Sequence, residues 1–390
     1  MTPLVSPSRS QSPSGPTSAR ASRWLGAAVS GRGPLALPDA SATAAHLYAP
    51  RGVWHDERRL IVADTGNHRV LIWRSFPTSD HQPADLVLVQ VEFAVEGPAS
   101  HGRGPARGVF LPTGVGVVEG RLVVADAWHH RVLIWDGVPD QTDQPPAFAL
   151  GQPDLETVEP DRGGAVSASG LRTPYGFGLV AGWFWVADTG NRRLLGWRGL
   201  PDRDRPAEAL LGQPNFERSD ENRGGPVAAD SFRWPHAVWG DADHLWVADA
   251  GNHRVVAWSP APQESGVVER PADLVVGQSD FFTNRELPHQ PQGAARLRFP
   301  YGVTGDAHRL IVADTANNRL LIWRGRPHQW EGPGCPADVV LGQPDFNASG
   351  ENRWRALEAD SLCWPYGIHL HGSRLAVADS GNNRVTLWEL

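Results

Sequence analysis

The sequence predicts an all-β protein that folds as a six-bladed β-propeller, with four antiparallel strands in each blade. A dodecamer that begins Val-Ala-Asp and ends in Trp occurs six times along the chain. Its Asp lies at positions 64, 126, 188, 249, 314 and 379, which are 61–65 residues apart. The chain is also rich in Gly and Pro, with 42 and 34 residues, and this composition favours many turns over long helices.

Each dodecamer predicts a β-hairpin. Two short β-rich runs, such as LIVAD and RVLIW, flank a tetrapeptide such as Thr-Gly-Asn-His. Val, Ile and Trp suit a half-buried pleated surface, and Gly and Asn supply the backbone angles of a tight turn. Two runs of this kind around such a tetrapeptide are typical of a hairpin.

Each repeat also contains one strand before the hairpin and one after it. The strand before it follows a Pro-x-Gly sequence or a near copy, and the strand after it ends in Gly-Gln-Pro or a near copy. The second kind of run ends at Leu155, Phe216, Phe281 and Phe346, with a decayed copy that ends at Phe93. Four strands in each of six repeats, with no helical period of useful length, predict radial repetition around an axis.

The ends of the chain predict how the ring closes. The chain ends two residues after the Trp of the sixth dodecamer, so the last repeat has no strand after its hairpin. The segment RWLG at 23–26 is a decayed copy of the missing strand, and we expect residues near 23–30 to complete the last blade. The propeller then covers 23–390, and residues 1–22, which are rich in Ser and Pro, are expected to form a disordered tail.

The repeat resembles a known family. Asp-x-Gly-Asn-His-Arg at 64–69 and 249–254, with relatives in the other four copies, is similar to the NHL repeat, and the similarity covers 23–390. The Gly-Gln-Pro-Asp-Phe element resembles a large bacterial branch of NHL proteins. This resemblance implies a propeller that serves as a platform for proteins or RNA, or occasionally as an enzyme, so the fold alone does not decide the function.

An Asp and an Arg of the dodecamer occur in all six copies and are predicted to build the blades. We expect the Asp to cap the turn and the Arg to bridge neighbouring blades through charge-assisted hydrogen bonds. The alternative is a six-fold ring of carboxylates that holds a cation. These residues are Asp64, Arg69, Asp126, Arg131, Asp188, Arg193, Asp249, Arg254, Asp314, Arg319, Asp379 and Arg384.

Candidate site residues stand where the repeats differ, directly after the Pro that begins the first strand. In blade order they are Arg51, Thr113, Tyr175, His236, Tyr301 and Tyr366. Three of the four Tyr of the chain occupy this one position, and we expect it at the mouth of the central channel, on the face that carries the hairpins. Because Tyr combines a rigid apolar body with a polar tip, these residues predict a ligand-binding constellation. Aromatic side chains that only plug the channel are the open alternative.

The resemblance also offers a test for catalysis. The peptidyl-hydroxyglycine amidating lyases, which are similar propellers, place zinc-binding histidines at this Pro-His position in three blades. Only His236 matches here, and a catalytic zinc usually takes three protein ligands, so that activity is not expected. No cofactor is predicted; a metal held by phenolates and one imidazole at the channel mouth is the alternative.

Two further sets of polar residues lie outside the channel. The hairpin tips carry residues that are expected to face solvent: His68, His129, His130, Arg192, His253, Asn318 and Asn383. A metal bound between His129 and His130 is a minor alternative. The long loops carry Arg162, Arg223 and Arg353, each twelve residues before the Pro of its blade. We expect these in an ordered structural turn or, as the alternative, on a rim that recruits an anionic ligand or an acidic partner.

Composition excludes or disfavours several classes of function. All 36 basic residues are Arg, so the chain has no Schiff-base lysine, phosphate-loop lysine or Ser-Lys dyad. A net charge of −7 disfavours sequence-independent binding of nucleic acid. No apolar run reaches about 18 residues, so no membrane span is expected. Cys335 and Cys363 are too few for a disulfide framework and favour a reducing cytoplasm, although one bridge between them is compatible with the sequence.

We therefore expect a monomeric, non-enzymatic propeller scaffold that binds a protein partner or a small ligand at the channel mouth. The alternative is a lyase or hydrolase in which His236 acts as ligand or base, Arg51 holds an anion and the Tyr residues donate protons. No pair of carboxylates stands out as general acid and base, because the carboxylates are numerous and periodic.

Overall fold

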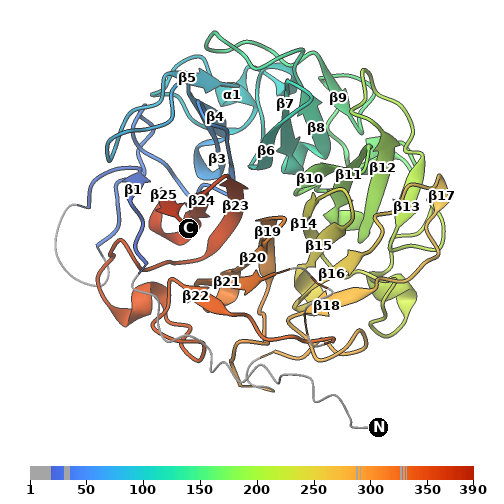
Figure 1. Ribbon diagram of the computed structural model, residues 1–390. Coiled ribbons are helices and arrows are strands. Elements are labelled where there is room, and N and C mark those ends of the chain that lie inside the picture. Colours follow the sequence, from blue (N-terminus) through green and yellow to red (C-terminus); the bar gives the residue numbers. More distant parts are fainter. Residues whose placement is uncertain are drawn as a thin grey trace, which may run out of the picture.

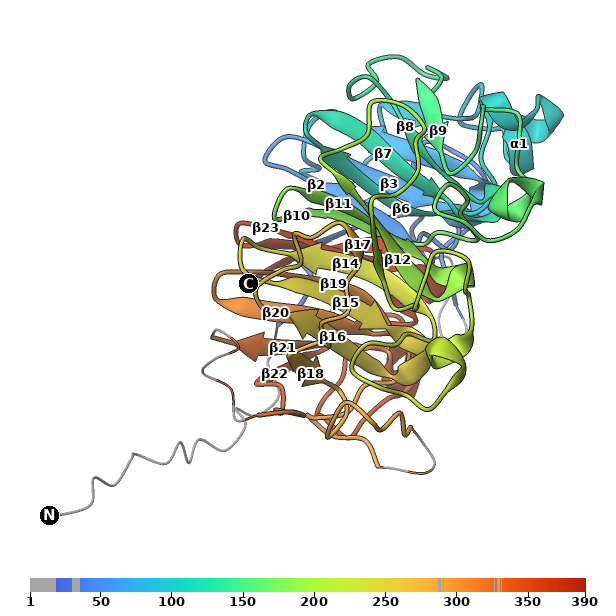
Figure 2. The ribbon, with the colours of Figure 1, turned by 90° about the vertical axis from the view of Figure 1, so that its right-hand side faces the viewer.

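The structure is a computed structural model of the 390-residue chain. It describes residues 19–29, 36–286, 289, 291–325, 327, 330 and 332–390. Six β-sheets stand around a central axis like the blades of a propeller, as the view along the axis shows (Figure 1). Seen from the side, the blades form a thick disc (Figure 2). The predicted all-β, six-bladed propeller is confirmed.

Each blade has four antiparallel strands, and the first strand lies nearest the axis. Blade 1 contains β2 (Gly52–His55), β3 (Leu60–Asp64), β4 (Arg69–Trp73) and β5 (Leu86–Leu88). Blade 2 contains β6 (Pro112–Val118), β7 (Arg121–Asp126), β8 (Arg131–Ile134) and β9 (Phe148–Leu150). Blade 3 contains β10 (Phe177–Val180), β11 (Trp183–Asp188), β12 (Arg193–Arg198) and β13 (Ala209–Leu211). Blade 4 contains β14 (Pro235–Gly240), β15 (Leu245–Asp249), β16 (Arg254–Trp258) and β18 (Leu274–Val276). Blade 5 contains β19 (Pro300–Asp306), β20 (Arg309–Asp314), β21 (Arg319–Arg324) and β22 (Val339–Leu341). Blade 6 contains β23 (Pro365–His371), β24 (Arg374–Asp379), β25 (Arg384–Glu389) and β1 (Arg23–Leu25).

Blade 6 takes its fourth strand from the N-terminal part of the chain, as predicted. β1 pairs antiparallel with β25, and the register places Trp24 opposite Thr386. The next residue after the strand, Gly26, has a φ of 122°. This strand closes the ring between the last and the first blade. Residue 30 of the predicted closing segment lies outside the described residues.

The predicted disordered tail, 1–22, falls partly within the described chain. Within residues 19–22, the backbone N–H of Ala21 donates to the carbonyl O of Ala359 at 2.9 Å. These four residues therefore contact the propeller at blade 6. Residues 1–18 lie outside the described residues.

Blade 3 has a short fifth strand that the repeat does not predict. β17 (Gly266–Val267) belongs to the connection between the third and fourth strands of blade 4, and it pairs in parallel with β13. Its backbone satisfies part of the edge that β13 would otherwise expose. The pairing also ties blade 4 to blade 3 at the outside of the ring.

The hairpin of each dodecamer turns through a short 3-10 helix. These helices are η1 (Thr65–Asn67), η3 (Ala127–His129), η5 (Thr189–Asn191), η7 (Ala250–Asn252), η8 (Thr315–Asn317) and η11 (Ser380–Asn382). The residue after each helix is left-handed, with φ between 52° and 55°. We call the face with these turns the hairpin face. The opposite face, with the turns between first and second strands, is the turn face.

The Asp and Arg of each dodecamer form a buried clamp. In all six blades the Arg Nε donates to the Asp Oδ2 at 2.7–3.0 Å, and both side chains are fully buried. In blade 1 the Nη groups of Arg69 also donate to the carbonyls of Phe93, Thr43 and His46. The Arg thus ties the loop that enters its own blade to the loop that leaves it. Removing one partner of such a buried pair costs about 3–5 kcal/mol.

Apolar side chains fill the space between adjacent blades. Each of six apolar clusters contains residues of two neighbouring sheets, such as Ile61 of blade 1 and Val124 of blade 2. The Trp that ends each dodecamer is at most 1% exposed. The indole N–H of Trp73 donates to the carbonyl O of Gln82 at 2.9 Å, so this Trp also holds the connection between the third and fourth strands.

The structure bears on the expected absence of membrane spans and on the two cysteines, whose pairing the sequence left open. Among the described residues, none of the helices has the length and apolar character needed to cross a membrane. Cys335 and Cys363 are not joined by a disulfide.

Candidate functional site

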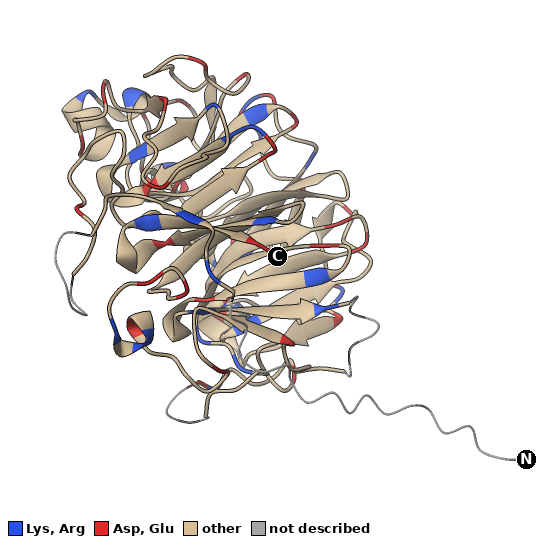
Figure 3. Ribbon diagram, turned by 60° about the vertical axis from the view of Figure 1, so that its left-hand side comes forward, with Lys and Arg blue, Asp and Glu red and all other residues tan. Residues whose placement is uncertain are grey.

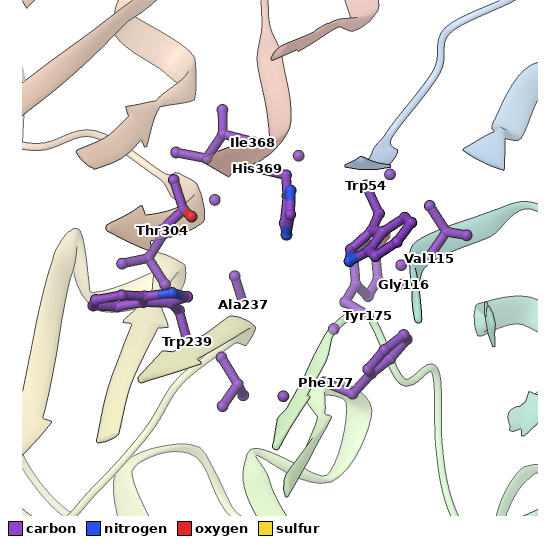
Figure 4. Close-up of a pocket in the computed structure, with 18 of the residues that line it drawn as sticks. Trp54, Val115, Gly116, Tyr175, Phe177, Ala237, Trp239, Thr304, Ile368 and His369 are labelled. Carbon is purple, nitrogen blue, oxygen red and sulfur yellow. The ribbon is translucent and has the colours of Figure 1, made fainter. Parts of the chain in front are cut away.

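A cavity of about 400 Å³ lies between the six first strands, on the axis of the propeller. Residues of β2, β6, β10, β14, β19 and β23 line it, and Figure 4 looks into it. Its volume is in the range of pockets that hold small organic molecules. The cavity is the candidate site because the blades project different side chains into it.

The structure brings all six predicted channel residues to this cavity, at the ends of the first strands near the hairpin face. These ring residues are Arg51, Thr113, Tyr175, His236, Tyr301 and Tyr366. Thr113 stays in the wall, because its hydroxyl donates to the carbonyl O of Tyr175 at 2.9 Å. The other five side chains extend toward one another.

The glycine after the ring residue lets neighbouring first strands approach each other. A Cβ on Gly52 would lie 2.6 Å from Thr113 O, and one on Gly367 would lie 2.4 Å from Arg51 O. Side chains do not tolerate such distances, so the Gly of Pro-x-Gly is required by the narrow ring. Blade 4 is the exception, with Ala237 at this position.

Hydrogen bonds from two blades fix the backbone before each ring residue. Three positions before it, a backbone N–H donates to Oδ1 of the clamp Asp of the same blade, as Tyr48 does to Asp64 at 2.7 Å. One position before it, the Pro carbonyl of blade 2 accepts from the hairpin of blade 1, where Thr65 Oγ1 lies 2.7 Å from Pro112 O. The clamp Asp, which is present in all six blades, and the hairpin Thr, which is present in blades 1, 3 and 5, thus position the residues that differ.

The hairpin tips cap the next blade rather than face solvent, which corrects the prediction. The N–H two positions before the ring residue donates to the tip, from Leu111 to His68 Nδ1 at 3.1 Å and from Trp364 to Asn318 Oδ1 at 2.8 Å. The same hydrogen bond is accepted by His130, His253 and Asn383. An acceptor near the backbone is needed at the tip. Arg192 of blade 3, which has only donors, does not provide it.

His129 and His130 do not form the metal pair that the sequence allowed. His129 replaces the hairpin Asn of the other blades, and its Nδ1 lies 2.9 Å from Asp126 Oδ2. His130 Nδ1 accepts the backbone N–H of Thr173 at 3.0 Å. Each Nδ1 thus has a separate structural partner.

Five ring side chains touch in a closed circuit. The ring centroids of Tyr175 and His236 lie 4.3 Å apart, those of His236 and Tyr301 lie 4.2 Å apart, and those of Tyr301 and Tyr366 lie 4.7 Å apart. Arg51 completes the circuit. Its Cζ lies 4.7 Å from the centre of the Tyr366 ring, and its Nη1 donates to the Tyr175 hydroxyl at 3.3 Å. Together they form a layer across the hairpin end of the cavity.

Arg51 brings an unpaired positive charge to this layer. Within the described residues its guanidinium forms one hydrogen bond, to Tyr175, and no ion pair. Its Nε is buried without a hydrogen-bond partner. The one acidic residue of the lining, Glu119, is exposed and follows the far end of β6, at the turn face.

Burial disfavours the charged forms of three ring residues, His236, Tyr301 and Tyr366. Burial lowers the pKa of His236 to about 4, and its Nδ1 lies 2.9 Å from Trp234 O, so Nδ1 carries the proton. Burial also raises the pKa of Tyr301 and of Tyr366 above the ordinary value of a phenol. These three side chains therefore add no charge beside that of Arg51 near pH 7.

A second layer of the lining lies three positions further along each first strand, and sequence reasoning missed it. Its residues are Trp54, Gly116, Gly178, Trp239, Thr304 and His369. Trp54 and Trp239 belong to blades 1 and 4 and lie on opposite sides of the cavity, with His369 between them (Figure 4). Burial lowers the pKa of His369 to about 3. The same comparison of repeats, made three residues after the ring position, would have found this layer.

The three loop arginines form ion pairs of their own. Arg353 Nη1 lies 2.7 Å from Asp360 Oδ2, and Arg162 and Arg223 each contact an Asp in the same way. None of the three lines the cavity. Because each charge already has a partner, these contacts favour the predicted structural turn over an anion-recruiting rim.

Potential metal ligands gather at one place among the described residues. Asp241, Asp243 and His244 lie within reach of one another on a turn of blade 4 at the turn face, away from the ring residues. The six clamp Asp residues do not form a free carboxylate ring, because every Oδ2 accepts a hydrogen bond from its Arg.

The hairpin face carries the large apolar side chains that are exposed in the described chain. They are 39–79% exposed and belong to the hairpins or to the loops between blades: Leu37, Tyr48, Val91, Trp128, Phe282, Trp354 and Trp364. Basic and acidic residues lie intermixed over the side shown in Figure 3.

Comparisons with known proteins show the fold. No protein-family model matches the chain, and no curated protein matches it in sequence. A protein of unknown function from Bacteroides thetaiotaomicron has a TM-score of 0.51 at 12% identity, over 95% of this chain and 75% of that one. Virginiamycin B lyase from Staphylococcus aureus has a TM-score of 0.44 at 10% identity, over 90% of this chain and 96% of that one. Raptor from Chaetomium thermophilum has a TM-score of 0.48 at 10% identity, over 95% of this chain and 29% of that one. At such identities the likeness concerns the fold alone.

Proposed function

We propose that the protein is a non-enzymatic propeller that binds a small organic molecule in its central channel. The observation that carries the proposal is the cavity of about 400 Å³, whose lining changes from blade to blade while the clamps and hairpins repeat. Residues that only build a blade recur in every blade. An asymmetric lining suits the recognition of one asymmetric ligand.

The chemistry of the ring favours binding over catalysis. A general base works best when its pKa lies near the operating pH, and the pKa of His236 is about 4. Tyr301 and Tyr366 hold their protons more tightly than ordinary phenols, because they are buried. The alternative of a lyase or hydrolase would need these same residues to move protons. Their environment suits hydrogen bonding and stacking instead.

We also infer that the repeats are of the NHL type. The support is the sequence Asp-x-Gly-Asn-His-Arg, together with the role of each of its polar residues in one buried network. Such repeats occur in propellers that bind partners, which is consistent with a binding function.

Blocking the channel tests the proposal. A Cβ on Gly116 would lie 3.4 Å from Phe177 Cε2 and 3.5 Å from Trp54 Cδ1, which is ordinary van der Waals contact. Gly116→Leu should therefore fold and fill the cavity. Thermal unfolding of the wild type in the presence of a library of small metabolites should reveal compounds that raise its midpoint, since a ligand that binds the folded state stabilises it. The same compounds should leave Gly116→Leu unchanged.

Gly137→Leu is the matched control, because a Cβ on Gly137 meets no atom within 4 Å. This variant should respond to ligands as the wild type does. A compound that stabilises all three proteins equally binds outside the channel. If every active compound behaves in that way, or if no compound stabilises the wild type, the proposal is wrong.

A protein partner on the hairpin face is the second candidate. It is favoured by the exposed aromatic side chains there, among them Trp128 and Trp364, which are 46% and 39% exposed. A partner identified by cross-linking should be lost in the double variant Trp128→Ser, Trp364→Ser and retained in Gly116→Leu. The reverse pattern would assign that partner to the channel.

A further inference from the structure

We infer that the ligand of the channel is an aromatic carboxylate, with its carboxylate on Arg51 and its ring between Trp54 and Trp239. This inference rests on the proposed function, because it names the class of ligand for the same cavity. Three features lead to it: an unpaired cation at one end, flat aromatic walls in the middle, and an acidic residue at the other end.

Arg51 supplies the group that binds the anion. Its Nη1 donates to the Tyr175 hydroxyl at 3.3 Å, whereas no described residue accepts from Nη2, and Nε is buried without an acceptor. A partly buried cation without a counterion is costly. The Nη2 group therefore keeps N–H donors without an acceptor, and a carboxylate is the anion that a guanidinium group binds best.

The neighbours of Arg51 add donors and no competing negative charge. The Tyr175 hydroxyl accepts from Arg51 and still has its own proton to donate to an anion. His236 stacks on Tyr301 with centroids 4.2 Å apart, which keeps both rings in the layer beneath the bound group. A carboxylate here meets hydrogen-bond donors and one guanidinium.

Trp54 and Trp239 form the walls of the middle of the channel. Both line the cavity, on opposite sides of it (Figure 4), and both are half-buried. Gly116 and Gly178, at the same position in blades 2 and 3, leave the space beside them open. Aromatic rings pack against other aromatic rings in stacked or edge-to-face contacts, so this layer suits an aromatic ring rather than a flexible chain.

The charges along the axis orient the ligand. Arg51 lies at the end that the ring side chains close, and Glu119 lies at the turn face, where the cavity lining continues to the surface. A carboxylate is repelled near Glu119 and attracted toward Arg51. The ligand therefore enters from the turn face with its carboxylate first.

Calorimetric titration of the full-length protein with 2-naphthoate and with its neutral isostere 2-naphthamide tests the inference. The wild type should prefer 2-naphthoate by at least about tenfold. Arg51→Gln should bring the two affinities to a ratio near one, mainly by weakening 2-naphthoate. Trp239→Leu should weaken both probes by a similar factor, because it removes a wall and no charge. If Arg51→Gln fails to fold, Arg51→Lys, which keeps the charge without the planar fork, should lose part of the preference.

Arg203→Gln is the control, since the Arg203 side chain is 76% exposed and lies outside the cavity. It should leave both affinities unchanged. If the wild type binds both probes equally, the assignment of a carboxylate is wrong although the channel still binds ligands. If neither probe binds while another compound loses its effect in Gly116→Leu, the ligand class is wrong and the proposed function stands. If no compound responds to Gly116→Leu either, both fail.

Discussion

His236 shows how the ring controls both the position and the charge of a side chain. It lies between the rings of Tyr175 and Tyr301, at centroid distances of 4.3 and 4.2 Å. Its enclosed position, with the Arg51 guanidinium on the same layer, disfavours a second proton and lowers its pKa to about 4. The imidazole therefore serves as a flat, neutral stacking group. Because it is neutral, it adds no charge beside the Arg51 guanidinium.

Acid should destabilise the protein through His236. Its pKa in the folded state is about 4, below the ordinary 6.5, so the unfolded chain binds more protons between these values. The free energy of unfolding should fall as the pH is lowered from 6.5 to 4, by roughly 1.4 kcal/mol per pH unit at most for this one group. His236→Phe keeps an aromatic ring that cannot titrate. Urea unfolding at each pH should show a shallower dependence for this variant.

His308→Gln, on an exposed turn, is the control and should keep the wild-type slope. His55 and His369 also have pKa values lowered by burial, so part of the acid sensitivity should remain in His236→Phe. A slope unchanged by His236→Phe would contradict the burial of a neutral imidazole at this position.

The residue positions of the site could be read from the repeat, whereas their contacts could not. Arg51 and Tyr175 stand at equivalent places in blades 1 and 3, so the sequence brings them to one ring. The direct hydrogen bond between them depends on Thr113 of blade 2 turning into the wall, which no pattern encodes. The layer of Trp54 was open to the same comparison. It lies inside a strand, three residues beyond the Pro-x-Gly position, where no turn residue marks it.

At the scale of the element, the hairpin is the unit that joins one blade to the next. Its tip residue is left-handed and accepts a backbone N–H of the following blade. The sequence predicted the turn from Gly and Asn but placed the tip in solvent, because a His or Asn in a turn carries no sign of a partner about 45 residues away. The same limit applies to β17, whose two residues pair with a blade other than their own.

The tip of blade 1 offers a direct test of this role. His68→Ala removes the acceptor of the Leu111 N–H, at a position whose φ of 52° is adopted more readily by His or Asn than by Ala. The free energy of unfolding should fall by about 2 kcal/mol. His68→Asn should cost less than about 1 kcal/mol, because Asn318 and Asn383 accept the equivalent bond in blades 5 and 6. Urea denaturation measures both. Equal losses for the two variants would show that the accepted hydrogen bond is not what the tip contributes.

At the scale of the whole molecule, the ring is closed without a covalent link. Blade 6 joins three C-terminal strands to β1, and the first strands of blades 6 and 1 meet beside the cavity. At that seam His55 is fully buried and its Nε2 lies 3.1 Å from His369 O. Because Trp54 and His369 of the cavity belong to these two blades, closure also sets the width of the channel.

Removing β1 should therefore open the ring and impair the site together. A chain that begins at residue 29 leaves the edge of β25 unpaired, and exposed edges associate with other chains. The midpoint of its thermal unfolding should fall, and sedimentation should show oligomers. The control is a chain that begins at residue 19, which keeps every described contact of β1 and should behave as the wild type. Adding a peptide of residues 19–29 to the shortened chain should restore the monomer and the response to channel ligands, since strand pairing supplies the missing edge. A shortened chain that stays monomeric with an unchanged midpoint would mean that blade 6 holds its place without β1, through its apolar packing against blades 5 and 1.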